Sequence, residues 1–147
     1  MARKAQIAEE TWEAFSRVMD AFKASFLNIS RGLDLSPGEL HALNALDPES
    51  VQPMGALAAE LRCDASNVTW LADRLEARGL VERRTAPTDR RVKTLALTAA
   101  GRALREQITT QLRTPPPQLL ALPIHELREL RHLLSKCVAE QPASENR

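Results

Sequence analysis

The sequence predicts a mainly α-helical fold of six helices with a small β-hairpin wing, a winged helix-turn-helix. The first observation is helical periodicity in residues 64–79, where apolar side chains recur on one face. The second is Trp70, which points away from that face and therefore towards water, a partner or DNA. The third is a pair of short β-like runs after this helix, around a basic turn. The apolar face consists of Val68, Leu71, Ala72 and Leu75.

Charge is distributed unevenly along this chain of 147 residues, although the net charge is only +1. A chain of this length forms one domain, or one domain with appendages for dimerisation. The window 62–105 holds ten basic and five acidic side chains, so it carries +5 and the remainder carries −4. Any affinity for nucleic acid must therefore come from this local asymmetry and not from the charge of the whole chain.

Several classes of protein are disfavoured by composition. No run approaches the roughly 20 apolar residues of a membrane span, and the N-terminus leads into a polar helix, so we expect a cytoplasmic protein without a membrane partner. Cys63 and Cys137 lie far apart, and the histidines add no metal-site spacing, so neither a metal nor a cofactor is expected. No nucleophile–base pair or phosphate loop is visible, which disfavours an enzyme.

The first predicted helix, residues 7–31, carries an apolar seam with successive spacings of three and four residues. Four of the five aromatic residues of the protein lie on this face. The seam indicates a packed or dimer-forming helix, and part of it could also line a pocket for an aromatic small molecule. The seam consists of Trp12, Phe15, Met19, Phe22 and Phe26.

Helix-capping residues define the next three helices. Ser36 and Glu39 form a capping box around Pro37, which starts a helix over residues 37–46. A short helix over 54–61 and a three-residue turn follow, which is the spacing of a helix-turn-helix. Asp64 caps the fourth helix, and Gly79 ends it in a left-handed conformation.

Two strands and two further helices complete the prediction. Residues 80–84 and 92–97 read as strands joined by a turn over 86–89. Thr98 caps a helix over 99–113, which three prolines terminate, and a last helix spans 124–139 with its own apolar seam. Because both ends of a short chain carry apolar seams, a twofold partner is the expected means of burying them.

This pattern resembles the MarR (multiple antibiotic resistance) family of transcriptional regulators. The resemblance covers nearly the whole chain in the order of its elements, and the hairpin motif Asp-x-Arg followed by Leu-Thr-x-x-Gly is its most specific part. The motifs are Leu57-Ala58…Leu61, Val68-Thr69…Leu71…Asp73-Arg74-Leu75, Gly79-Leu80-Val81…Arg83, Asp89-Arg90-Arg91 and Leu97-Thr98…Gly101.

The resemblance implies a homodimer that binds double-stranded DNA with a pseudo-palindromic operator. Residues 1–35 and 99–147 would form the dimerisation region, and residues 36–98 the DNA-binding domain. Arg91 would enter the minor groove, Asp89 would orient it, and Arg74 would contact the DNA backbone. Arg90 shares the basic wing tip, which without the family motif would be read as a solvated turn. The base-facing positions would be Ser66, Asn67, Thr69 and Trp70.

The side-chain chemistry supports these roles independently. Asn67 can pair bidentately with adenine, and hydroxyl groups can reach bases or phosphates. A guanidinium at a hairpin tip suits a narrow A·T-rich minor groove. Trp70 is a departure, because many relatives carry arginine or another polar residue there. It could contact thymine methyls or sugar edges, or it could cover a neighbouring helix.

The expected function is a repressor that a small aromatic or phenolic ligand releases from DNA. In the family, such ligands bind between the dimer helices and the DNA-binding lobe, and Trp12, Arg17 and His41 are the candidate contacts here. His41 could equally be a surface group, and Cys63 and Cys137 read as buried structural residues. The alternative function is a winged-helix module that binds protein through the Trp70 face.

Overall fold

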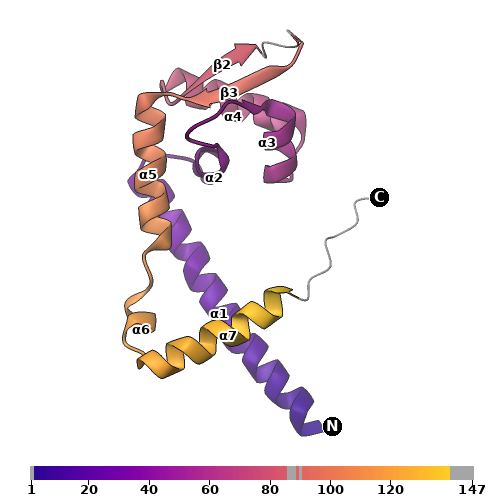
Figure 1. Ribbon diagram of the computed structural model, residues 1–147, viewed down its shortest axis with the longest axis vertical. Helices are drawn as coiled ribbons and strands as arrows, with labels where there is room; N and C mark the ends of the chain where they lie inside the picture. The colour runs from indigo at the N-terminus through magenta and orange to yellow at the C-terminus, as the bar shows by residue number, and fades with distance from the viewer. Residues whose placement is uncertain (1, 86–88, 90, 140–147) are drawn as a thin grey trace. The chain divides into compact units, whose positions relative to one another are not determined.

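The computed structural model describes residues 2–85, 89 and 91–139. The chain divides into two compact units, Met1–Leu112 and Arg113–Arg147, and each is described by itself. The helices are α1 (Ala2–Gly32), α2 (Pro37–Ala45), α3 (Met54–Leu61), α4 (Ala65–Ala77), α5 (Ala99–Arg113), α6 (Pro117–Leu120) and α7 (Ile124–Ala139). The strands are β1 (Gln52–Pro53), β2 (Val81–Thr85) and β3 (Lys93–Leu97). The winged helix-turn-helix prediction is confirmed, and Figure 1 shows α2, α3 and α4 beside the β2–β3 hairpin.

The predicted helix caps are present. Ser36 and Glu39 form the capping box of α2, with the Ser36 N–H 2.7 Å from Glu39 Oε2. At the start of α4, Asp64 Oδ1 accepts a hydrogen bond from the Asn67 N–H at 2.8 Å. Gly79 adopts a φ of 68° just beyond α4, which is the left-handed conformation that glycine tolerates best. Local chemistry therefore fixes where α2 and α4 begin and where α4 ends.

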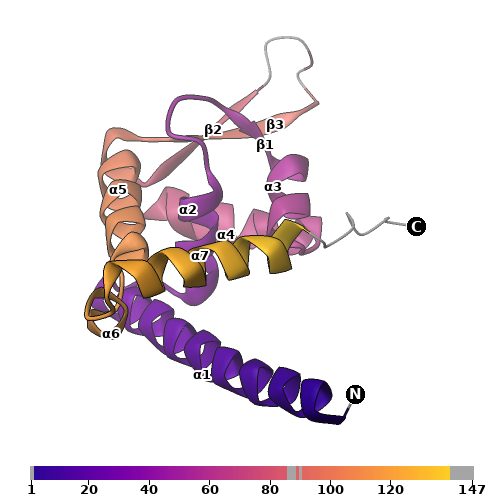
Figure 2. The same ribbon diagram turned by 60° about the horizontal axis from the view of Figure 1, so that its bottom comes forward.

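The sheet has three antiparallel strands in the order β1-β3-β2. The predicted hairpin pairs Val81 with Leu97 and Thr85 with Lys93. The sequence did not predict β1, which is two residues long and pairs Gln52 with Leu95 (Figure 2). Strand β1 leads directly into α3, so this pairing ties the helix-turn-helix to the wing.

One apolar core holds the first unit together, and α4 contributes the face that the sequence predicted. From outside residues 36–98, Ile108 of α5 is fully buried, and Phe26 and Ile29 near the end of α1 pack against the core. The earlier part of α1 is exposed almost throughout. The core residues of α2, α3, α4 and the sheet are Leu40, Ala42, Leu43, Leu57, Val68, Leu71, Ala72, Leu75, Val81, Leu95 and Leu97, and Leu35, Leu46 and Leu80 of the connecting segments join them.

The start of α5 is locked against the hairpin. Thr98 Oγ1 donates to the Gly79 carbonyl at 2.6 Å and accepts from the Gly101 N–H at 3.0 Å. The Thr98 N–H also donates to the Leu80 carbonyl at 3.1 Å. A Cβ on Gly101 would lie 1.9 Å from the Leu80 oxygen, so no side chain fits there without movement of the backbone. This contact explains the threonine and glycine of the Leu-Thr-x-x-Gly motif.

The second unit corrects two predictions. The prolines end α5 as expected, but a short helix, α6, follows, so the described residues form seven helices and not six. Pro117 starts α6, because proline is tolerated at the first position of a helix, where no N–H partner is needed. Cys137, predicted to be buried, is exposed on α7, whereas Cys63 packs partly buried against the core. Among the helices described, none is long and apolar enough to cross a membrane.

Candidate nucleic-acid interface

The outer face of α4 presents the four predicted base-facing residues to solvent. Ser66, Asn67, Thr69 and Trp70 are all exposed. The Ser66 hydroxyl donates to Asp64 Oδ1 at 2.6 Å, and the Thr69 hydroxyl donates to the Ala65 carbonyl at 2.9 Å. Each hydroxyl thus uses its proton within the fold, and its oxygen keeps the capacity to accept a hydrogen bond. The Ser66 hydroxyl, followed by the Asn67 N–H, lowers the pKa of Asp64, which keeps this N-cap ionised.

Trp70 and Arg74 form a stacked pair on this face. The Arg74 guanidinium carbon lies 5.1 Å from the centre of the Trp70 ring, a cation–π distance, and the Trp70 side chain is 51% exposed. Arg74 Nε also donates to Oε1 of Glu39 on α2 at 3.1 Å. Arg74, the predicted contact to the DNA backbone, is thus also held within the fold.

Glu39 is a fully buried carboxylate beneath this pair. Burial alone favours the neutral form, and it is the largest single influence on the pKa. Hydrogen bonds from Ser36 and the positive charge of Arg74 together outweigh burial and hold the pKa of Glu39 below its ordinary value. The sequence identified Glu39 only as a capping residue. Local sequence patterns do not predict that Glu39 pairs with Arg74, because the two residues lie 35 positions apart.

Arg83 of β2 is a functional candidate that belongs to the family motif but to which the sequence assigned no role. Its guanidinium lies 2.5 Å from Asp73 Oδ1 and 3.1 Å from Glu76 Oε2, both on α4. It also donates to the Thr69 carbonyl at 3.2 Å. Unpaired acids on this helix would repel a polyanion such as DNA, and Arg83 offsets one of the two negative charges. Strand β2 and α4 are therefore joined by ion pairs as well as by the core.

The wing turn is organised by Asp89. Its Oδ1 accepts the Arg91 N–H at 2.9 Å, and its carbonyl accepts the Val92 N–H at 3.0 Å. Asp89 thus contacts Arg91 through the main chain, while the Arg91 side chain is exposed. Arg90 was predicted to contribute to the wing tip and lies outside the described residues.

The three predicted ligand contacts do not form one pocket within a single chain. Trp12 stacks on Phe15 with ring centres 5.8 Å apart, and Arg17 pairs with Glu13 at 2.6 Å. His41 is exposed on α2. Trp12 lies about 30 Å from the C-terminal end of α1, because a helix rises about 1.5 Å per residue. His41 lies on α2, which begins beyond that end. Across the ranges described, no group of three acidic, histidine or cysteine side chains could hold a metal.

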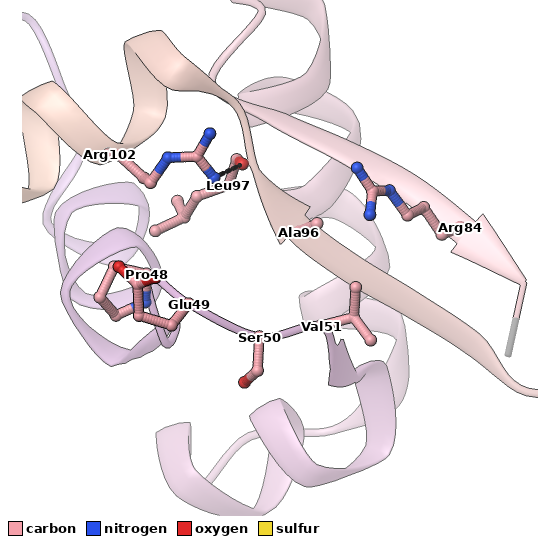
Figure 3. Close-up of a pocket in the computed structure, with 8 residues that line it drawn as sticks. All are labelled: Pro48, Glu49, Ser50, Val51, Arg84, Ala96, Leu97 and Arg102. Atoms are coloured by element: carbon pink, nitrogen blue, oxygen red, sulfur yellow. Dashed lines mark hydrogen bonds between the residues drawn. The ribbon is translucent and has the colours of Figure 1, made fainter.

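A shallow pocket of about 90 Å³ lies elsewhere, beside the sheet (Figure 3). The loop between α2 and β1 forms one wall, and the strands and α5 form the other. Arg102 donates to the Leu97 carbonyl at 3.0 Å and so is already used within the fold. None of the predicted ligand contacts lines this pocket. Its lining residues are Pro48, Glu49, Ser50, Val51, Arg84, Ala96, Leu97 and Arg102.

Comparison with known proteins agrees with this geometry. The fold and the exposed helix define a winged-helix protein, and a model of the MarR family matches residues 35–93. The HTH-type transcriptional regulator MhqR of Bacillus subtilis (strain 168) is 31% identical over 74 residues, which are 50% of this chain and 51% of MhqR. The match thus spans about half the length of that curated relative. Over this part of its length, the chain is similar to the MarR family of transcriptional regulators.

Solved structures share the fold over most of their length. Apo MarR from E. coli is 25% identical with a TM-score of 0.72, covering 85% of this chain and 93% of that one. The F27L mutant of S. aureus MepR, bound to an oligodeoxyribonucleotide, is 21% identical with a TM-score of 0.67, covering 88% and 96%. NadR in complex with 4-hydroxyphenylacetate is 24% identical with a TM-score of 0.66, covering 86% and 88%.

Proposed function

We propose that this protein is a homodimeric, sequence-specific DNA-binding regulator, acting as a repressor that a small aromatic or phenolic ligand releases. One observation carries the proposal. The helix α4 buries its apolar face completely, yet it exposes Ser66, Asn67, Thr69 and Trp70 together on the opposite face. None of these four side chains belongs to the apolar core, and their groups suit the donors, acceptors and methyl groups of a major groove.

In this proposal α4 lies in the major groove and the wing lies along the adjacent minor groove. Asn67 reads a base edge, and Arg91 enters the minor groove with its main chain held by Asp89. Arg74 contacts a phosphate, and Arg90 adds positive charge at the wing tip. The bound oligodeoxyribonucleotide in the MepR structure supports this use of the shared fold. A twofold dimer would meet a pseudo-palindromic operator with half-sites about one helical turn apart.

The exposed apolar surface of α1 supports the dimer. A monomer rarely leaves a row of large apolar side chains in water, and a second copy would cover it by twofold symmetry. We assign residues 1–35 and 99–147 to dimerisation and residues 36–98 to DNA binding, although α5 also contributes Ile108 to the core. The exposed apolar side chains of α1 are Ile7, Trp12, Phe15, Val18, Met19 and Phe22, and those of α7 include Ile124, Leu133, Leu134 and Val138.

The effector proposal takes support from NadR, which was solved with a phenolic acid bound. In this chain Trp12, Arg17 and His41 are the assigned contacts, and the dimer would have to bring them together from two copies. A ligand lowers DNA affinity only by its preference for the state that does not bind DNA. A ligand that binds the free and the DNA-bound protein equally would contradict this mechanism.

The test of the proposal is a gel-shift titration at fixed salt with DNA from upstream of the protein's own gene. We expect a shifted complex that scrambled DNA of the same length does not compete away. The Trp70→Ala variant should bind more weakly if Trp70 contacts bases or sugars, and unchanged affinity would rule out that contact. If no specific complex forms, the exposed Trp70 face would instead serve a protein partner, which is the second candidate function.

A further inference from the structure

The buried carboxylate of Glu39 does more than cap a helix. Its two oxygens have different partners: Oε2 accepts the Ser36 N–H at 2.7 Å, and Oε1 accepts Arg74 Nε at 3.1 Å. A capping box needs only a side-chain acceptor at this position, and glutamine supplies one as well as glutamate. The negative charge is therefore superfluous for the cap. The negative charge instead serves to pair with Arg74, through Oε1.

A buried charge is costly unless a partner compensates for its lost hydration. Glu39 is fully buried, whereas the Arg74 side chain is 51% exposed. The pair thus anchors one end of Arg74 inside the domain and leaves the rest of its guanidinium at the surface of α4. An unanchored arginine would have many rotamers available, and Glu39 removes most of that freedom.

Arg74 transmits this constraint to Trp70. The two residues are four apart on α4, which places their side chains next to each other on the helix surface. The guanidinium lies over the indole ring at 5.1 Å from its centre. Because Glu39 holds the planar guanidinium of Arg74 in place, the guanidinium in turn restricts the indole ring of Trp70 that stacks on it. The result is a chain of three groups from the interior to the outer face: Glu39, Arg74 and Trp70.

We infer that Glu39 is a positioning residue for DNA recognition, which orients Arg74 and, through it, Trp70 before duplex DNA is bound. This inference rests on the proposed function. The side chains of Arg74 and Trp70 lose their conformational entropy when the protein folds and not when it binds DNA. This preorganisation strengthens DNA binding. Glu39 itself lies out of reach of DNA because it has no exposed surface.

The first experiment needs no DNA. In a Trp12→Phe background Trp70 is the sole tryptophan, so its emission and its quenching by acrylamide report on the ring alone. Glu39→Gln keeps the capping box and removes the charge. We expect this variant to shift both signals towards those of Arg74→Gln, with helix content by circular dichroism unchanged. Glu76→Gln is the matched control, because Glu76 pairs with Arg83 instead. Unchanged Trp70 signals in Glu39→Gln would overturn the inference.

The second experiment is a double-mutant cycle on operator affinity. We expect Glu39→Gln to weaken binding by about fivefold to tenfold in the wild-type background and to have no effect in the Arg74→Gln background. Equal effects in both backgrounds, or no effect in either, would overturn the inference. Failure of the proposed function is distinguishable, because then the wild-type protein itself would not prefer operator to scrambled DNA.

Discussion

Arg83 at the start of the wing lies 2.5 Å from Asp73 on the recognition helix. The same guanidinium reaches Glu76 at 3.1 Å, so one cation of β2 holds two successive turns of α4. These ion pairs join α4 to β2, the two elements that enter neighbouring grooves of DNA in the proposed function. The Arg83 side chain is 28% exposed, but those of Asp73 and Glu76 are 58% and 41% exposed, so water screens both ion pairs and each contributes modestly to stability.

Replacement of Arg83 by glutamine should weaken operator binding although Arg83 points at α4 and not outward. We expect a loss of about tenfold in affinity and a stability loss of about 1 kcal/mol, because two acids lose their partner beside the DNA surface. Gel shift and thermal unfolding measure the two effects. Arg84→Gln is the matched control, since Arg84 pairs only with the exposed neighbour Glu82 among the described ion pairs. Equal effects from both substitutions would contradict the special role of Arg83.

Gly101 should be irreplaceable for a steric reason. We expect Gly101→Ala to lower the free energy of unfolding by about 3 kcal/mol, because its Cβ would lie 1.9 Å from the Leu80 carbonyl oxygen. Chemical denaturation monitored by circular dichroism measures the change. Gly55→Ala is the control, since nothing lies within 4 Å of the added Cβ there. A Gly101→Ala protein as stable as Gly55→Ala would refute this packing of α5 against the hairpin.

Glu39 should make the fold sensitive to acid. Its lowered pKa means that the folded state binds fewer protons than the unfolded chain in the window below the ordinary value of 4.5. The stabilisation from Glu39 is therefore complete above pH 4.5 and is lost as the pH falls through the folded-state pKa. Denaturation from about pH 3 to about pH 7 should show a shallower acid loss in Glu39→Gln than in the wild type.

The wild type keeps an acid dependence that does not come from Glu39. Asp47 and Asp64 also have lowered pKa values, through hydrogen bonds that begin with the Glu49 N–H and the Ser66 hydroxyl respectively. Both contributions are the same in the wild type and in Glu39→Gln, so the difference between the two curves isolates Glu39. Parallel curves would mean that Glu39 gains nothing from ionisation in the folded state.

The exposed seam of α1 leads to a prediction about assembly. Phe22 is 52% exposed in the single chain, and a charge at this position would be buried in the proposed dimer. We expect Phe22→Glu to shift the protein from dimer to monomer in sedimentation equilibrium. Lys23→Glu, a change at a neighbouring exposed position, should leave the dimer intact. A wild-type monomer, or a Phe22→Glu dimer of unchanged affinity, would contradict the assignment of α1 to dimerisation.

The parts of the fold that sequence predicted are those with local causes. The capping box of Ser36, the N-cap of Asp64 and the left-handed Gly79 each act within a few residues, and all three are present. The pairing of Gln52 with Leu95 could not be predicted, because a two-residue strand has no periodicity and exists only through a distant partner. Helix α6 was missed because prolines end one helix and can also begin another.

In the candidate site, too, sequence predicts the features with local causes and misses the contacts between distant residues. The exposure of Ser66, Asn67, Thr69 and Trp70 follows from helical periodicity and is present in the structure. The supporting contacts do not follow from it. Arg74 pairs with an acid 35 residues away, and Arg83 belongs to a different element from the acids it neutralises. Sequence patterns thus predict which side chains face outward, whereas tertiary packing decides which of them are held in place.

The central claim is that α4 and the wing of a twofold dimer read DNA together. Hydroxyl-radical footprinting on the upstream DNA tests it most directly, with the wild type and with Arg91→Ala. We predict two protected segments about one helical turn apart, flanked by minor-groove protection that Arg91→Ala loses. The slope of log affinity against log salt concentration should also be smaller in magnitude for Arg91→Ala, by roughly one for each Arg91 contact of the dimer. A wild-type protein that protects no defined segment, or a flanking protection unaffected by Arg91→Ala, would contradict the account.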